Sequence, residues 1–89
     1  MTIFDMLDQL IEKGASDLHI VLNAQPTLRV DGVLVPIDGT PALTADQTQT
    51  LIEPVLTDAQ KTRYAEEKEI DFGYQYRDQG RFRVNVYRH

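Results

Sequence analysis

The stretch GASDLHI, residues 14–20, is where the periodicity of this chain changes. Before it, residues 2–13 carry apolar side chains at the spacing of an amphipathic helix. Gly14 then suits the left-handed position that closes a helix. After Gly14, Leu18 and Ile20 begin an alternation of apolar and polar residues that is typical of a strand. The stretch therefore predicts a helix, a tight turn and a strand, and the rest of the fold is built outward from it.

Two hairpins are predicted further along the chain. Residues 27–35 form two short apolar segments around Asp31-Gly32, a pair that readily adopts a type I′ turn. Residues 70–76 and 82–86 alternate in the same way on either side of a turn that contains Gly80. The sequence therefore predicts strands in both halves of the chain.

Helices are predicted between the two hairpins. Thr44 and Thr57 each begin a capping box that opens a helix, the second of which runs to about Lys68. Pro54 is expected to kink or shorten the first of these helices. The order α-β-β-β-α-α-β-β predicts the α+β class, with an antiparallel sheet and helices packed on one side of it.

Length and composition indicate one small domain. The chain has 89 residues, a net charge of −5 and no cysteine. The acidic balance argues against the broad basic surface that binds nucleic acid, and the missing cysteines exclude disulfides and thiolate chemistry. No apolar run approaches the roughly 20 residues of a membrane-spanning helix, and the N-terminus lacks the pattern of a signal peptide. These features fit a cytoplasmic protein.

Asp17 and His19 are the first candidates for chemistry. They share one face of the predicted strand, so they could pair as a base oriented by an acid. Such a dyad needs a nucleophile or a metal, and the only other histidine is His89. The favoured alternative is that Asp17 caps or pairs locally and that His19 lies on a polar or contact face. We therefore predict no catalytic residue and no metal site.

The glycine pattern bears on nucleotide binding. The chain contains neither G-x-x-x-x-G-K-[ST] nor G-x-G-x-x-G, and its five glycines are isolated. We therefore expect no cofactor for this chain and no ATP hydrolysis by it alone.

The C-terminal strand is the most basic part of the chain. Residues 77–89 contain four arginines and one acid. Arg81, Arg83, Asn85 and Tyr87 share one face of the predicted strand. Two arginines on one face could clamp a phosphate or a carboxylate across an interface. The simpler alternative is that they solvate the exposed face of an edge strand.

Four motifs, taken in order, carry a resemblance to a known family. GASDLHI, LRVDGVL, EIDFGYQY and GRFRVNVY resemble the N-terminal domain of the type IV pilus retraction ATPase family (PilT), a branch of the secretion ATPases. The resemblance runs from about Ile3 to Tyr87. The matching residues are Gly14 to His19, Arg29 to Gly32, Asp71-Phe72 and Arg81 to Asn85. Gly73, where the family often has serine, and Pro26, without a preceding proline or glycine, are departures.

The resemblance implies a PAS-like α+β domain spanning residues 1–89. In the intact protein a RecA-like ATPase domain with the Walker motifs follows, so this chain is expected to be a fragment. The full-length parent is expected to bind ATP and Mg²⁺, to form a hexamer and to drive twitching motility. Expected partners are its own RecA-like domain, neighbouring subunits and the pilus platform protein, at the inner face of the cytoplasmic membrane. No nucleic-acid partner is expected.

The resemblance also implies roles for particular residues. An arginine of the R-F-R segment is expected to reach the nucleotide of a neighbouring subunit; Arg83 is favoured and Arg81 is the second choice. The structural signature of the family falls on Gly14, Asp17, His19, Arg29, Asp31, Gly32 and Asp71. Within it, Gly14 ends the helix, Asp17 fixes the strand entry and His19 faces a contact surface.

Other functions fit the same sequence. The parent could instead be a pilus-assembly or type II secretion ATPase, although the motifs begin so close to residue 1 that the retraction branch is favoured. The chain could also be a free-standing PAS-like module for interaction or sensing. A downstream Walker motif in the same reading frame would separate the motor from the free-standing module.

Overall fold

The computed structural model describes residues 1–88 as three α-helices, one short 3-10 helix and five strands. In chain order the elements are α1 (Ile3–Glu12), β1 (Asp17–Val21), β2 (Thr27–Val30), β3 (Val33–Pro36), α2 (Ala45–Ile52), the short 3-10 helix η1 (Glu53–Val55), α3 (Asp58–Glu67), β4 (Ile70–Gln75) and β5 (Arg81–Tyr87). This order is the predicted one, and the α+β class is confirmed. Among these residues, no helix has the length and apolar character needed to cross a bilayer.

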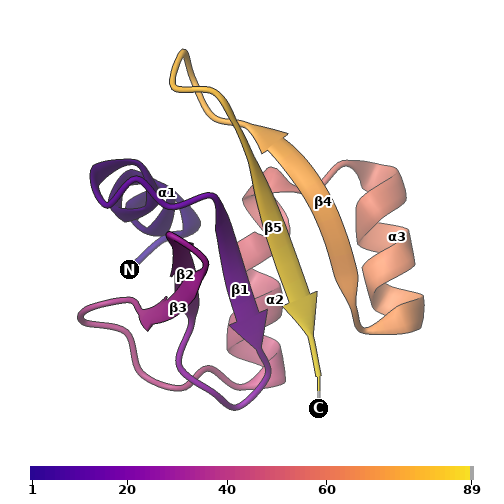
Figure 1. Ribbon diagram of the computed structural model, residues 1–89. Coiled ribbons are helices and arrows are strands. Elements are labelled where there is room, and N and C mark those ends of the chain that lie inside the picture. The colour runs from indigo at the N-terminus through magenta and orange to yellow at the C-terminus, as the bar shows by residue number, and fades with distance from the viewer. Residues whose placement is uncertain (89) are drawn as a thin grey trace.

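The five strands form one sheet in the order β3-β2-β1-β5-β4. Both hairpins are antiparallel as predicted, but β1 and β5 at the centre run parallel. Figure 1 shows these two strands side by side with their arrowheads at the same end. The sheet is therefore mixed, which corrects the expectation of an antiparallel sheet. Side-chain alternation fixes which face a residue occupies but not the direction of a neighbouring strand, and the helical crossover between β1 and β5 permits the parallel pair.

The core lies between one face of the sheet and the helices. Leu18 of β1 is paired in register with Leu28 of β2 and Val84 of β5, and all three are fully buried. The helix α1 covers them with one apolar stripe, made of Ile3, Met6, Leu7 and Leu10. The other face of the sheet is left for polar residues.

Local sequence signals explain where the helices begin and end. Capping boxes open α1 at Thr2, α2 at Thr44 and α3 at Thr57, each with both reciprocal hydrogen bonds formed. Gly14, with φ of 65°, follows α1 in the left-handed conformation. Pro54 lies in η1, and α2 ends at Ile52, so the proline shortens the helix as predicted.

Thr57→Ala should lower the free energy of unfolding by about 1 kcal/mol, because the amide of Gln60 loses its acceptor at the start of α3. Thr62→Ala, the same change within α3, is the matched control and should stay within about 0.5 kcal/mol of the unchanged chain. Urea unfolding followed by circular dichroism measures both. Equal losses in the two variants would show that the cap contributes nothing of its own.

Candidate functional site

The face of the sheet turned away from the core carries two rows of polar residues. One row crosses β2, β1, β5 and β4 through Arg29, Asp17, Arg83 and Gly73. The next row crosses the same strands through Thr27, His19, Asn85 and Asp71. Because successive side chains alternate between faces, both rows lie opposite the buried Leu18 and Val84. We call this surface the open face.

Arg83 is anchored to β4 by a two-pronged ion pair. Its Nε donates to Asp71 Oδ1 at 3.0 Å and its Nη2 donates to Oδ2 at 2.7 Å. The hydrogen bond from Arg83 holds the pKa of Asp71 below its usual value. The two side chains are 65% and 50% exposed, so solvent screens the pair and it can open.

Asn85 supports the same carboxylate from β5. With its amide nitrogen turned toward Asp71, Asn85 donates to Oδ1 at 3.0 Å and to Oδ2 at 3.2 Å. Asp71 therefore receives hydrogen bonds from two side chains of β5 at once. This arrangement ties the β4–β5 hairpin together on the open face.

Asp17 is the centre of a second cluster, on β1 and β2. Its Oδ2 accepts from His19 Nε2 at 2.6 Å and lies 3.5 Å from Arg29 Nε, while the Ser16 hydroxyl donates to Oδ1. The side chains of Asp17 and His19 are only 13% and 11% exposed. The pair is therefore mostly withdrawn from solvent, even though it points away from the core.

The electrostatics of Asp17 favour a structural role. Burial raises the pKa of its carboxyl group, but the hydrogen bonds from Ser16 and His19 and the neighbouring positive charge of Arg29 outweigh that effect. The pKa therefore lies below the usual 3.8, and Asp17 is ionised at neutral pH. Ser16 donates to Asp17 and not to His19, so these three residues lack the hydroxyl-to-imidazole hydrogen bond of a Ser-His-Asp triad.

His19 is held on its other side by an aromatic neighbour. Its ring meets the ring of Tyr87 edge-on, with 6.4 Å between the centroids. Its Nδ1 is buried and has no hydrogen-bond partner among residues 1–88. The ring is therefore fixed by Asp17 and Tyr87 within the domain, an arrangement that favours packing over proton transfer.

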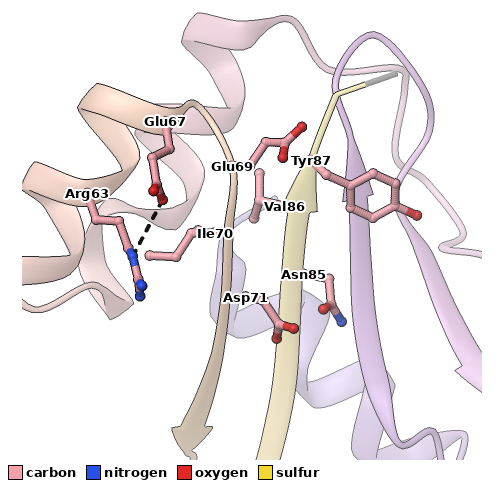
Figure 2. Close-up of a pocket in the computed structure, with 8 residues that line it drawn as sticks. All are labelled: Arg63, Glu67, Glu69, Ile70, Asp71, Asn85, Val86 and Tyr87. Carbon is pink, nitrogen blue, oxygen red and sulfur yellow. Dashed lines mark ion pairs between the residues drawn. The ribbon is translucent and has the colours of Figure 1, made fainter.

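An open hollow of about 430 Å³ lies beside the open face, where α3 meets the edge of the sheet. Figure 2 shows Glu67 paired with Arg63 on α3, across from Asp71 and Asn85 on the strands. The residues that line the hollow are Arg63, Glu67, Glu69, Ile70, Asp71, Asn85, Val86 and Tyr87. The acids outnumber the single arginine, so this hollow is a poor receptor for an anion.

The strand pairing brings together only part of the predicted site. Asp17, His19, Arg29, Asp71 and Arg83 meet on the open face. The remaining signature residues lie at turns, namely Gly14 after α1 and the pair Asp31-Gly32 between β2 and β3.

Arg81 lies beside Arg83 on β5 but makes a weaker contact. Its Nη2 donates to the carbonyl oxygen of Gly73 at 3.3 Å. The roles of Ser16 and Gly73 and the contact of Asn85 with Asp71 were not predicted from the sequence. Only the isolated glycine within a strand pattern could have pointed to one of these contacts.

Metal binding finds no support in the part of the chain described, which ends at Arg88. No three histidine, aspartate or glutamate side chains there are grouped so that they could hold an ion. His89, the second histidine, lies outside the described residues.

Known proteins resemble this chain in sequence. No family model matches it. The chain is 35% identical over 82 residues to the type IV pilus ATPase PilU of Pseudomonas aeruginosa, and 36% identical over 87 residues to the type IV pilus retraction ATPase PilT of the same organism. These alignments cover 92% and 98% of the chain but 21% and 25% of the two relatives, so the chain spans a quarter of their length or less.

A solved structure agrees with the sequence. The crystal structure of the pilus retraction motor PilT with bound ADP superposes on the chain with a TM-score of 0.76 and 32% identity, over 93% of the chain and 24% of that structure. The chain is a relative of the N-terminal domain of PilT-family ATPases. The resemblance of the four motifs to PilT is thereby confirmed, and the similarity supports a domain of a pilus motor ATPase.

Proposed function

We propose that this chain is the non-catalytic N-terminal domain of a hexameric pilus-retraction ATPase. In this proposal the domain packs on the ATPase domain of a neighbouring subunit and contributes an arginine to the nucleotide interface. The observation that carries it is the open face, where motif residues from four separate stretches of the chain meet beside Arg81 and Arg83. The similarity to PilT over nearly the whole chain supports the same proposal.

The chemistry of the two arginines suits this role. A guanidinium group is planar, always charged and able to donate two parallel hydrogen bonds to a phosphate. An arginine supplied from a neighbouring domain stabilises the charge that develops on a transferred phosphoryl group. Loss of that phosphate would release the contact, so the nucleotide state would be coupled to the position of the domain.

ATP and Mg²⁺ belong to the parent motor in this proposal. The five glycines of the chain are isolated, so it offers no glycine-rich loop that could hold a triphosphate. The Walker motifs of the RecA-like domain would bind both groups, and the open face would only approach them. The motor would act in the cytoplasm, at the inner face of the membrane, together with the pilus platform protein.

A chimeric motor tests the proposal. Residues 1–88 would replace the matching segment of Pseudomonas aeruginosa PilT in a strain that lacks PilT, and twitching motility would be measured. We expect the chimera to restore twitching. The matched control carries Arg81→Ala and Arg83→Ala together, and it should assemble normally but restore no twitching.

Two outcomes would count against the proposal. A chimera that forms hexamers and hydrolyses ATP but does not restore twitching would exclude a retraction-type domain. A double arginine variant as active as the unchanged chimera would exclude the contribution of an arginine. Sequencing the gene beyond His89 for an in-frame G-x-x-x-x-G-K-[ST] is the first check, because a free-standing module would lack it.

A further inference from the structure

A second open hollow lies on the helical side of the domain, between the start of α1, the loop that follows β3, and α2. Its volume is about 470 Å³, which is in the size range of ligand sites. Met6, Leu43 and Leu51 line it and belong to the core or pack against it. The other residues that line it are Met1, Gly39, Thr40, Pro41, Asp46, Gln47 and Thr50. We call it the methionine hollow, because both methionines of the chain line it.

The walls of the methionine hollow are held in place by hydrogen bonds within the domain. The backbone N–H of Asn23 donates to the carbonyl of Leu43 at 2.7 Å, and the N–H of Leu43 donates to the carbonyl of Ala24 at 3.3 Å. The hydroxyl of Thr40 donates to the carbonyl of Ile37 at 2.6 Å and closes the loop after β3. The hollow is therefore preformed, and little conformational entropy would be lost in shaping it for a partner.

The two methionines make this hollow adaptable. Met1 is 57% exposed, and its Cε lies 3.7 Å from the position that a Cβ on Gly39 would take, so this side chain lies against the loop. Met6 is 2% exposed and belongs to the core. Methionine is unbranched and polarizable, and it is common on surfaces that accommodate apolar partners. The pair suits a surface that adjusts to an apolar side chain from another molecule.

The charge around the methionine hollow is acidic. None of the described residues that line it is basic, and Asp46 has no ion-pair partner within residues 1–88. Asp38 adjoins the rim; its side chain is 88% exposed, and Lys13 approaches it at 3.3 Å. Residues 1–60 contain nine acids and two bases, a net charge of −7. An acidic rim around an apolar centre attracts a cationic, apolar partner and repels an anionic membrane surface.

The lining also selects the form of the partner. Its residues come from helices and loops and none from a strand, so an extended peptide finds no sheet edge to join there. Binding would come from side chains that enter the hollow, as an amphipathic helix presents them.

We infer that the methionine hollow is the docking site for a basic amphipathic helix of a partner protein. An apolar side chain of that helix enters between α1 and α2, and a lysine or arginine lies beside Asp46. The inference goes beyond the proposed function, which uses the open face on the other side of the sheet, and it stands without it.

The test uses the 89-residue chain with ¹³C-labelled methionine methyl groups, because its two methionines give two resonances, both from the hollow. The probe is a peptide of about 18 residues with leucines on one helical face and lysines on the other. We expect it to shift both methyl resonances saturably, with an affinity that falls as sodium chloride is added. A second peptide with glutamate in place of every lysine keeps the apolar face and should bind about tenfold more weakly.

Thr50→Trp is the decisive variant. Thr50 is exposed on α2 and lines the hollow, so an indole there fills the space and leaves the core unchanged. It should weaken binding of the lysine peptide about tenfold. Gln49→Trp, at the adjacent exposed position of α2 but outside the lining, is the matched control and should leave the affinity within about twofold.

Asp46→Asn measures the contribution of charge without adding bulk. It should weaken binding of the lysine peptide about threefold, because the cation of the peptide loses its partner on the rim. Asp58→Asn, in the first turn of α3 and outside the lining, is the matched control and should leave the affinity unchanged. Urea midpoints close to that of the unchanged chain would show that the variants are folded, and Asp46→Asn carries the test if Thr50→Trp is not.

Four results would overturn the inference. The first is a lysine peptide that shifts neither methyl resonance. The second is a glutamate peptide that binds as tightly, which would mean that the acidic rim does not select the partner. The third is equal binding to Thr50→Trp and Gln49→Trp, which would place the peptide elsewhere. The fourth is a shift of both resonances with the concentration of the chain alone, because a second copy would then occupy the hollow. The chimeric motor tests the open face, so its outcome is independent of this titration.

Discussion

Asp17→Asn should lower the free energy of unfolding by about 2–3 kcal/mol, a large share of the stability of so small a domain. The carboxylate accepts from Ser16 and His19 and faces Arg29, so removing its charge leaves a mostly buried donor and a cation without their partner. Arg29 is 41% exposed and can turn to solvent, which keeps the loss below that for a fully buried ion pair. Urea unfolding measures the difference.

The same substitution at the hairpin tip provides the control. Asp31 is exposed and has φ of 49°, a conformation that asparagine also tolerates. Asp31→Asn should therefore stay within about 0.5 kcal/mol of the unchanged chain. A loss at Asp17 no larger than the loss at Asp31 would mean that the buried cluster does not stabilise the fold.

The contribution of Asp17 to the free energy of unfolding should also depend on pH and should fall as the pH falls. Its pKa is lower in the folded chain than the usual 3.8, so the unfolded chain binds the proton more readily. The stabilisation is then complete above about pH 4 and is lost as the pH falls toward the folded-state pKa. The difference in stability between the unchanged chain and Asp17→Asn should shrink in that range, and a constant difference would contradict this account.

The elements of this fold were predictable because their signals are local. A capping box needs only a threonine and a partner three residues later, and the boxes at Thr2, Thr44 and Thr57 all formed. Asp31-Gly32 adopted the expected turn for the same reason. The parallel pairing of β1 with β5 was not predictable in this way, because it joins segments more than sixty residues apart through the packing of both on the helices.

The candidate site was predictable as a set of residues but not as an arrangement. Alternation placed Arg81 and Arg83 on one face, and the resemblance to PilT picked out Asp17 and Asp71. The contact of Arg83 with Asp71 depends on the register of β4 against β5, which the hydrophobic pattern constrains only to steps of two residues. The sequence alone therefore could not predict which side chains contact one another across neighbouring strands.

Leu18→Ala should destabilise the domain by about 3 kcal/mol, the largest effect we expect from a single substitution in the core. Leu18 is 0% exposed and lies between Leu28 of the antiparallel strand β2 and Val84 of the parallel strand β5, where a rigid central strand cannot collapse into the space left behind. Leu34→Ala is the matched control: Leu34 lies on the edge strand β3, is 47% exposed and should lose only about 0.5–1 kcal/mol.

Because Leu18 separates Asp17 from His19 in the chain, its loss should also loosen the polar cluster on the opposite face. Urea unfolding of the double variant Leu18→Ala, Asp17→Asn checks this coupling. We expect the loss of unfolding free energy in the double variant to be smaller than the sum of the two single losses. Strict additivity would show that the two faces of β1 act independently.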